Sequence, residues 1–209
     1  RETSCLVKAA NDLLHLPPNT DVETTSILRK AIRANVELAR LKGYCLTIPN
    51  DRMLVNAIVL KEAQASSEIE NIITTQDKLY QALSVKDHNT DPATKEILNY
   101  REALWKGHSL LQRNNLLTTN AIVEIQEHLE GNSAGIRKLP GTALVNDRTG
   151  ETVYVPPDNP ATILSLLANL EKYLNASDET DPLIKMAIAH YQFESIHPFY
   201  DGNGRTGRI

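Results

Sequence analysis

The chain has 209 residues, of which 41% are hydrophobic and 23% charged, and its formal net charge is −4. These values are ordinary for a globular domain, and the charge gives no overall attraction to nucleic acid or to an anionic membrane. No apolar run approaches the ~18 residues of a membrane span, and the N-terminus carries no recognisable targeting segment. We therefore expect a cytoplasmic protein that binds neither nucleic acid nor membranes, with Cys5 and Cys45 as reduced, partly buried thiols.

The N-terminal part of the chain has helical periodicity. Residues 24–41 and 53–67 each place apolar side chains at steps of three and four residues, which is typical of amphipathic helices. A further helix is expected over 119–130, between a threonine cap at Thr118 or Thr119 and a stop at Gly131.

Three more helices are expected to begin at an Asx–Pro pair. In such a pair the Asx side chain can accept a hydrogen bond from a first-turn N–H, and proline at the first helical position loses none. The pairs are Asp91-Pro92, Asn159-Pro160 and Asp181-Pro182, which predict helices over about 92–113, 160–174 and 182–196.

One segment departs from this helical pattern. Residues 142–157, TALVNDRTGETVYVPP, alternate in polarity and are rich in β-branched residues on either side of a turn sequence, which predicts a β-hairpin. A lone hairpin is only marginally stable, so we expect it to lie on a helical body as a flap with at least one unpaired edge.

The chain closes on HPFYDGNGRTGRI, residues 197–209, which contains a Gly-x-Gly-x-x-Gly string. A dinucleotide-binding fold needs an apolar strand directly before such a string, but the preceding residues 182–196 have helical spacing. The Walker phosphate loop is excluded as well, because no Gly-Lys-Ser/Thr follows. What remains is a helix, a short loop and a glycine-rich turn that opens a second helix.

That turn has the residue types of a phosphate site. Two glycines let the backbone approach an anion closely, an amide adds a donor and two arginines can fork onto phosphate oxygens: Gly202, Gly204, Asn203, Arg205 and Arg208. Asp201 beside such donors suggests a bridging Mg²⁺, and His197 is suited to accept a proton from an attacking hydroxyl. Composition alone leaves two readings open, phosphoryl or nucleotidyl transfer and a capped loop whose Asp and Arg side chains only pair with each other.

HPFYDGNGRTGR resembles the signature of the Fic family, His-x-Phe-x-Asp/Glu-Gly-Asn-Gly-Arg-x-x-Arg, at every specified position. The resemblance implies an all-α fold: a Fic-like helical bundle with one β-hairpin flap, preceded by a helical N-terminal region. It covers nearly the whole chain, with the N-terminal region at 1–114 and the catalytic core at 115–209. Because the signature ends one residue before the chain does, we expect the helices that follow it in the family to lie beyond residue 209 of a parent protein.

The resemblance also implies a role for each matching position. His197 would deprotonate the target hydroxyl, Phe199 would anchor the loop in the core, and Asp201 would hold Mg²⁺ on the phosphates of ATP. The backbone of Gly202 and Gly204, with Asn203, would surround the α-phosphate. Arg205 and Arg208 would contact the β- and γ-phosphates. The target segment would pair with the flap as an added strand, along Thr152, Val153 and Tyr154. Simple packing of the second strand is the alternative for these three.

A second motif lies in AQASSEIENIITT, residues 63–75. Ser66, Glu70 and Asn71 resemble Ser/Thr-x-x-x-Glu-Gly/Asn, the inhibitory motif of Fic proteins in the subgroup that carries it N-terminal to the core. Ser66 and Glu70 are one helical turn apart and share a face. Glu70 would pair with Arg208 and so take up the arginine that the γ-phosphate needs; the alternative is a solvated helix carboxylate near a cap.

The resulting hypothesis is a self-inhibited protein adenylyltransferase that uses ATP and Mg²⁺. Its partner would be a protein with a Tyr, Ser or Thr hydroxyl, or the protein itself, and a homodimer is left open. Two alternatives remain: removal of AMP or transfer from another nucleotide at the same site, and a nucleotide-binding regulatory or antitoxin-like module without turnover.

Overall fold

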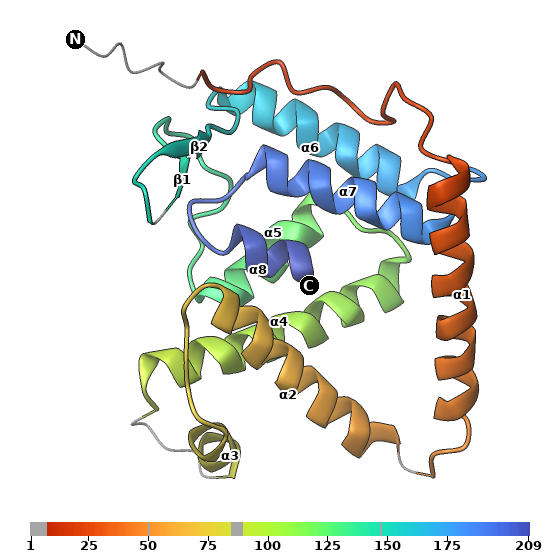
Figure 1. Cartoon of the computed structure of the whole chain (residues 1–209). Coiled ribbons are helices and arrows are strands. Elements are labelled where there is room, and N and C mark those ends of the chain that lie inside the picture. Colours follow the sequence, from red (N-terminus) through yellow and green to blue (C-terminus); the bar gives the residue numbers. More distant parts are fainter. Residues whose placement is uncertain (1–7, 50, 85–89, 147) are drawn as a thin grey trace.

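A computed structural model of the chain describes residues 8–49, 51–84, 90–146 and 148–209, without the side chains of 51–53. The regular elements within these ranges are helices and one small antiparallel hairpin, joined by loops (Figure 1). The elements are α1 (Thr25–Cys45), α2 (Asp51–Ile69), α3 (Gln76–Ser84), α4 (Pro92–Asn114), α5 (Thr119–Glu130), β1 (Leu144–Val145), β2 (Thr152–Tyr154), α6 (Pro160–Asn175), α7 (Pro182–Ile196) and α8 (Asn203–Arg208).

The helix starts follow the predicted capping chemistry. Proline occupies the first turn of α4, α6 and α7, and the preceding Asx side chains of Asp91, Asn159 and Asp181 accept from backbone N–H groups within those turns. Thr118 caps α5 in the same way, and Gly131 ends that helix with a left-handed φ of 65°. The Asx–Pro signals and the predicted helix over 119–130 are thus confirmed.

Two clusters of buried side chains form the core, and α5 contributes to both. The first joins α5, α6 and α7 with the loop after α7; it contains Ile122, Ile163, Leu166, Leu167, Leu170, Tyr173, Ala189, Phe193, Ile196 and Phe199. The second joins α2, α3, α4 and α5; it contains Leu60, Ala63, Leu79, Ile97, Tyr100, Ala103, Ile125 and Leu129. Because α5 packs on both sides, it fixes α2 and α4 relative to the loop after α7. The predicted division at 114/115 stays a prediction.

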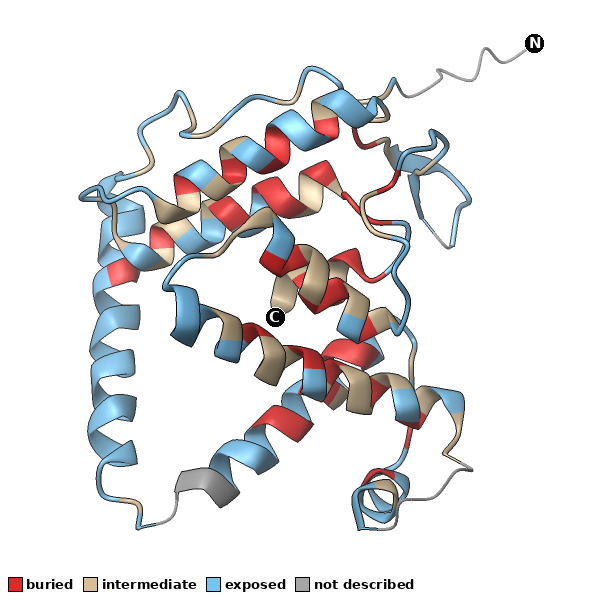
Figure 2. Cartoon of the chain, turned by 180° about the vertical axis from the view of Figure 1, so that it is seen from behind, coloured by how far each residue is buried: buried red, intermediate tan, exposed pale blue. Residues whose placement is uncertain are grey.

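Helix α1 stands at the edge of the molecule and contacts the start of α7 (Figures 1 and 2). Of its predicted apolar stripe only Ala31 is buried, whereas Leu38 and Leu41 are 49% and 58% exposed. Cys45 at its end is exposed, so the prediction of a partly buried thiol is wrong there; Cys5 lies outside the described residues. Within the described ranges, no helix combines the length and apolar content that crossing a bilayer requires.

The predicted hairpin is present but its strands are short. Leu144 pairs with Tyr154 and Val145 with Thr152, so the register shifts by one residue between them. The Tyr154 hydroxyl donates to the backbone oxygen of Ser195, 2.8 Å away, near the end of α7. The hairpin is therefore tied to the helix that leads into the signature motif.

Candidate active site

The signature motif forms the turn between α7 and α8. His197 ends α7 in a left-handed conformation, with φ 48° and ψ 61°, and its N–H donates to the carbonyl of Phe193. A residue with a Cβ adopts this conformation at a cost of about 1–2 kcal/mol, so surrounding contacts must hold it. Phe199 is fully buried against Phe193, with ring centroids 6.2 Å apart, which confirms its predicted role as the anchor of the loop.

Side-chain hydrogen bonds close the loop on itself. Asn203 accepts from the Phe199 N–H at 2.9 Å and donates to the Phe199 carbonyl at 2.8 Å, so its amide holds the loop instead of pointing outward. Asp201 accepts from the N–H of Gly202 at 2.7 Å, and its side chain is 81% exposed. Gly202 has φ +75° and lies against the carboxylate of Glu130, so a Cβ there would be both strained and blocked.

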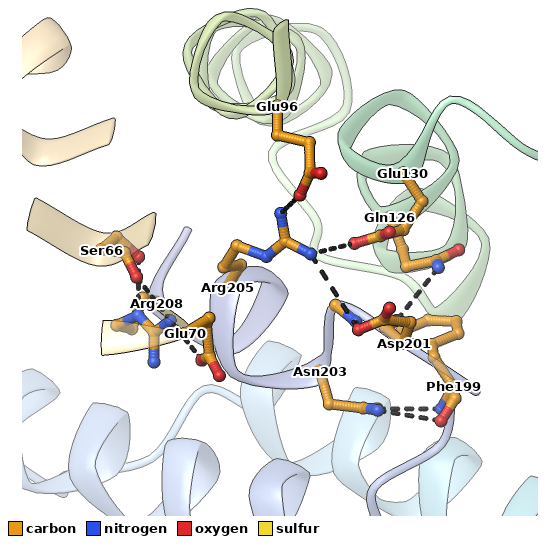
Figure 3. Close-up of polar contacts among 11 residues, drawn as sticks. Ser66, Glu70, Glu96, Gln126, Glu130, Phe199, Asp201, Asn203, Arg205 and Arg208 are labelled. Atoms are coloured by element: carbon orange, nitrogen blue, oxygen red, sulfur yellow. Dashed lines mark hydrogen bonds and ion pairs between the residues drawn. The ribbon is translucent and has the colours of Figure 1, made fainter. Parts of the chain in front are cut away.

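Arg205 points away from the mouth of the loop, toward α4 and α5 (Figure 3). Its side chain is 4% exposed and pairs with Glu130 of α5 at 2.8 Å and with Glu96 of α4 at 3.1 Å. A longer ion pair, 4.0 Å, joins it to Asp201 in the loop itself. Burial raises the pKa of Glu130 above its ordinary value, although the charge of Arg205 acts in the opposite direction. The arginine therefore fastens the glycine-rich turn to both neighbouring helices.

Arg208 is held by the second motif (Figure 3). Its Nε donates to Ser66 Oγ at 2.6 Å, and its Nη2 donates to the Ser66 carbonyl at 3.0 Å and to Glu70 Oε1 at 2.7 Å. The same oxygen lies over Gly204: a Cβ built on that glycine would be 2.6 Å from Glu70 Oε1. The carboxylate thus sits between Arg208 and the first turn of α8. The structure brings Ser66 and Glu70 to the signature motif from 138 to 142 residues away in sequence.

Asn71 explains why the second motif ends in Asn. It has φ 61°, which asparagine and glycine adopt far more readily than other residues. The N–H of Ile72 then donates to the carbonyl of Ser67, as at helix ends that close with a left-handed residue. Asn71 therefore turns the chain directly after Glu70, just past the end of α2 at Ile69, although its side chain takes no part in the contact with Arg208.

The surroundings of His197 favour the neutral imidazole. Burial lowers its pKa, and the charge of Arg137 lowers it further; the backbone carbonyl of Glu194 and the carboxylates of Glu70 and Asp201 act in the opposite direction. A neutral imidazole at neutral pH can accept a proton.

The flap residues fall into two groups. Thr152 and Val153 are exposed, whereas Tyr154 is half-buried and bonded to Ser195. Four residues around the motif were not predicted, because nothing in the sequence sets them apart from ordinary helix or loop residues: Glu96, Gln126, Glu130 and Arg137.

Comparison with protein families assigns both parts of the chain. The model "Fic/DOC family N-terminal" matches residues 28–109, and "Fic/DOC family" matches residues 116–209. The chain belongs to the Fic/DOC family. As a Fic protein it is similar to two solved structures. A Fic family protein from Desulfovibrio desulfuricans G20 gives a TM-score of 0.68 at 22% identity, covering 94% of this chain and 57% of that one. A single-substitution variant of Fic-1 from C. elegans gives a TM-score of 0.59 at 20% identity, covering 88% of this chain and 55% of that one. At these identities the likeness shows the fold, which confirms the predicted all-α class with a hairpin.

Curated relatives carry the name "Protein adenylyltransferase Fic". The protein from Culex quinquefasciatus is 28% identical over 181 residues, which is 86% of this chain and 33% of the relative. The protein from Drosophila ananassae is 29% identical over 149 residues, which is 70% of this chain and 27% of the relative. The chain therefore spans about a third or less of the length of these relatives.

Proposed function

We propose that this chain carries the active site of a self-inhibited protein adenylyltransferase, which transfers AMP from ATP to a Tyr, Ser or Thr hydroxyl of a protein. The observation that carries the proposal is the position of Glu70 Oε1, against both Gly204 and Arg208. A carboxylate stands where glycine backbone and an arginine would receive an anion. The name of the curated relatives supports the reaction type.

His197 acts as the base in this proposal. It takes the proton of the target hydroxyl, the hydroxyl oxygen bonds to the α-phosphorus, and the bond from that phosphorus to the bridging oxygen breaks, releasing pyrophosphate. The lowered pKa of His197 supports the role, because the imidazole is neutral before the proton arrives. His197 stands in a left-handed conformation at the end of α7, directly before the signature loop.

The residues present fit Mg²⁺ bound together with a nucleotide. Asp201 is exposed and uses one carboxylate oxygen on Gly202. No cluster of three or more His, Cys, Asp or Glu side chains suited to a metal occurs in the described part of the chain. Mg²⁺ commonly binds through one or two carboxylates plus phosphates and water, so a lone exposed Asp201 suits it. Bound there, Mg²⁺ would supply neutralisation of phosphate charge.

The proposed nucleotide contacts require some donors to leave their present partners, among them the Gly202 N–H, which donates to Asp201. The backbone of Gly202 and Gly204 would meet the α-phosphate, and Asn203 supports them by closing the loop. Arg208 would meet the γ-phosphate once Glu70 leaves. The predicted contact between Arg205 and the phosphates requires one of its three ion pairs, with Glu96, Glu130 or Asp201, to open.

Glu70 would inhibit the site in two ways, by binding the arginine that the nucleotide needs and by repelling its phosphates. Glu70 takes up Arg208 through a charge-assisted bond, and its negative charge opposes an incoming phosphate at Gly204. Ser66 fixes the same guanidinium through a second bond, so Arg208 is held by two residues of α2 and its end.

The target would be a protein segment that adds to the flap beside Thr152 and Val153, both exposed, with Tyr154 anchoring the strand. A cytoplasmic location stays a prediction. A homodimer stays a prediction.

Intact-mass spectrometry of the full-length protein with ATP and Mg²⁺ tests the proposal. Glu70→Gly protein should gain one AMP on itself or transfer it to an added protein target, and His197→Ala in that background should not. Loss of AMP from a pre-modified target would favour the removal reaction. Transfer from another nucleotide would redefine the substrate. Nucleotide binding with no covalent product in any variant would favour the regulatory module without turnover.

A further inference from the structure

Arg137 is a buried cation that the proposed chemistry does not use. It lies in the loop between α5 and β1 and is 1% exposed. No carboxylate forms an ion pair with it within the described ranges. Instead its guanidinium donates to three backbone carbonyls: Nε to His197 at 2.7 Å, and Nη2 to Ile196 at 3.2 Å and to Pro157.

Two of these carbonyls belong to the C-terminal end of α7. The last turn of a helix leaves carbonyl oxygens without partners and carries a partial negative charge, which a cation stabilises. The last turn of α7 has no basic residue of its own. Arg137, from another segment of the chain, supplies the cation that stabilises this helix end.

The third carbonyl, at Pro157, closes the segment that follows β2. Backbone contacts strengthen the same junction: the N–H of Arg137 donates to the Pro198 carbonyl at 2.9 Å, and the N–H of Lys138 donates to the Tyr200 hydroxyl at 2.9 Å. The base of the flap and the turn after α7 are therefore joined through one guanidinium.

We propose that Arg137 is a positioning residue that holds His197 in its left-handed turn and fixes the flap relative to it. This inference rests on the proposed function, because it assigns Arg137 to the alignment of the base with a hydroxyl that the flap presents. Arg137 touches neither the glycine-rich turn nor Arg208. Its loss should therefore slow the transfer step and leave nucleotide affinity almost unchanged.

The charge of Arg137 gives a second, independent readout. It lowers the pKa of His197, whereas Glu70, Asp201 and the Glu194 carbonyl raise it. Removing the cation should therefore raise the pKa of His197 and move the acidic limb of the pH–rate profile to higher pH. Replacing it with another cation should leave that limb in place while the alignment is still lost.

The experiment uses full-length protein in the Glu70→Gly background, with Arg137→Lys and Arg137→Gln. Lys138→Ala is the matched control, because it removes a cation one residue away whose side chain is exposed and makes no contact that the structure shows. Transfer rates are measured with radiolabelled ATP, nucleotide affinity by calorimetry with Mg²⁺ and a non-hydrolysable ATP analogue.

We expect kcat to fall about ten- to a hundredfold in Arg137→Lys, since a misplacement of around 1 Å can cost this much. Affinity for the analogue should change less than about threefold, and Lys138→Ala should match its parent. Only Arg137→Gln should move the acidic limb upward. Equal kcat in Arg137→Lys and its parent would overturn the inference, and so would a parallel loss of kcat and nucleotide affinity, which would indicate a purely structural role.

Hydrogen exchange separates this inference from the proposed function. If the Glu70→Gly protein transfers no AMP, the proposed function fails, while the amides of His197, Phe199 and Tyr200 still report on the turn. Faster exchange at these amides in Arg137→Lys than in Lys138→Ala supports the positioning role. Unchanged exchange there overturns it.

Discussion

Glu70→Gly should raise AMP transfer strongly while it destabilises the fold only slightly. The Glu70–Arg208 pair spans 2.7 Å with side chains 41% and 24% exposed, so its loss should lower the free energy of unfolding by only about 0.5–1 kcal/mol. Glycine just past the end of α2 adds less than the roughly 0.5–1 kcal/mol that it costs within a helix. By contrast, like charges about 4 Å apart at an effective dielectric constant near 20 repel by about 4 kcal/mol. If loss of Glu70 relieves even part of this repulsion in the transition state, the rate of AMP transfer should rise roughly a hundredfold.

The assay is transfer of radiolabelled AMP, with thermal unfolding measured on the same preparations. Glu68→Gly is the matched control, since Glu68 is an exposed carboxylate near the end of the same helix and does not contact Arg208. Glu70→Gln separates charge from hydrogen bonding, because it keeps a possible bond to Arg208 and loses the negative charge. Equal transfer by the parent, Glu68→Gly and Glu70→Gly would refute the reasoning.

Three further predictions concern the signature motif and the end of α2. His197→Ala in the Glu70→Gly background should abolish transfer yet keep nucleotide binding by calorimetry, because the imidazole is the base and not a phosphate ligand. The pH–rate profile of Glu70→Gly should lose activity only as pH falls through the pKa of His197, which burial and Arg137 place below its ordinary value near 6.5; a limb above that value would contradict this. Asn71→Val should lower the free energy of unfolding by about 1–2 kcal/mol, measured by denaturant titration, because a β-branched residue resists φ near 61°; an unchanged midpoint would argue against the strain.

The helical framework could be predicted because its signals are local. Asp91, Asn159 and Asp181 each cap a helix through a bond that spans only two or three residues, so the sequence alone contains both partners. Helix α3 was missed because it is short and buries only Leu79, which leaves too little periodicity to detect.

The burial of α1 was not predictable for a different reason. Periodicity places apolar residues on one stripe but does not say what covers that stripe, and in the structure Leu38 and Leu41 face outward. For the same reason the sequence did not predict that the thiol of Cys45, at the end of α1, is exposed.

Within the site, the signature and the second motif identified Glu70 and Arg208, and the structure brings them together. The residues that hold the motif in place were missed. Arg137 binds carbonyls at Pro157, Ile196 and His197, and main-chain carbonyls carry no side-chain signature for a sequence to show. Glu96 and Glu130 look like ordinary helix carboxylates until Arg205 is placed between them.

Calorimetry with Mg²⁺ and a non-hydrolysable ATP analogue tests the central claim most directly, that the turn around Gly204 receives nucleotide phosphates when Glu70 is absent. The full-length Glu70→Gly protein should bind the analogue in a magnesium-dependent manner, and Arg208→Ala in that background should bind it at least about tenfold more weakly, as expected for a lost charge-assisted contact. Absence of magnesium-dependent binding by Glu70→Gly protein would contradict the claim.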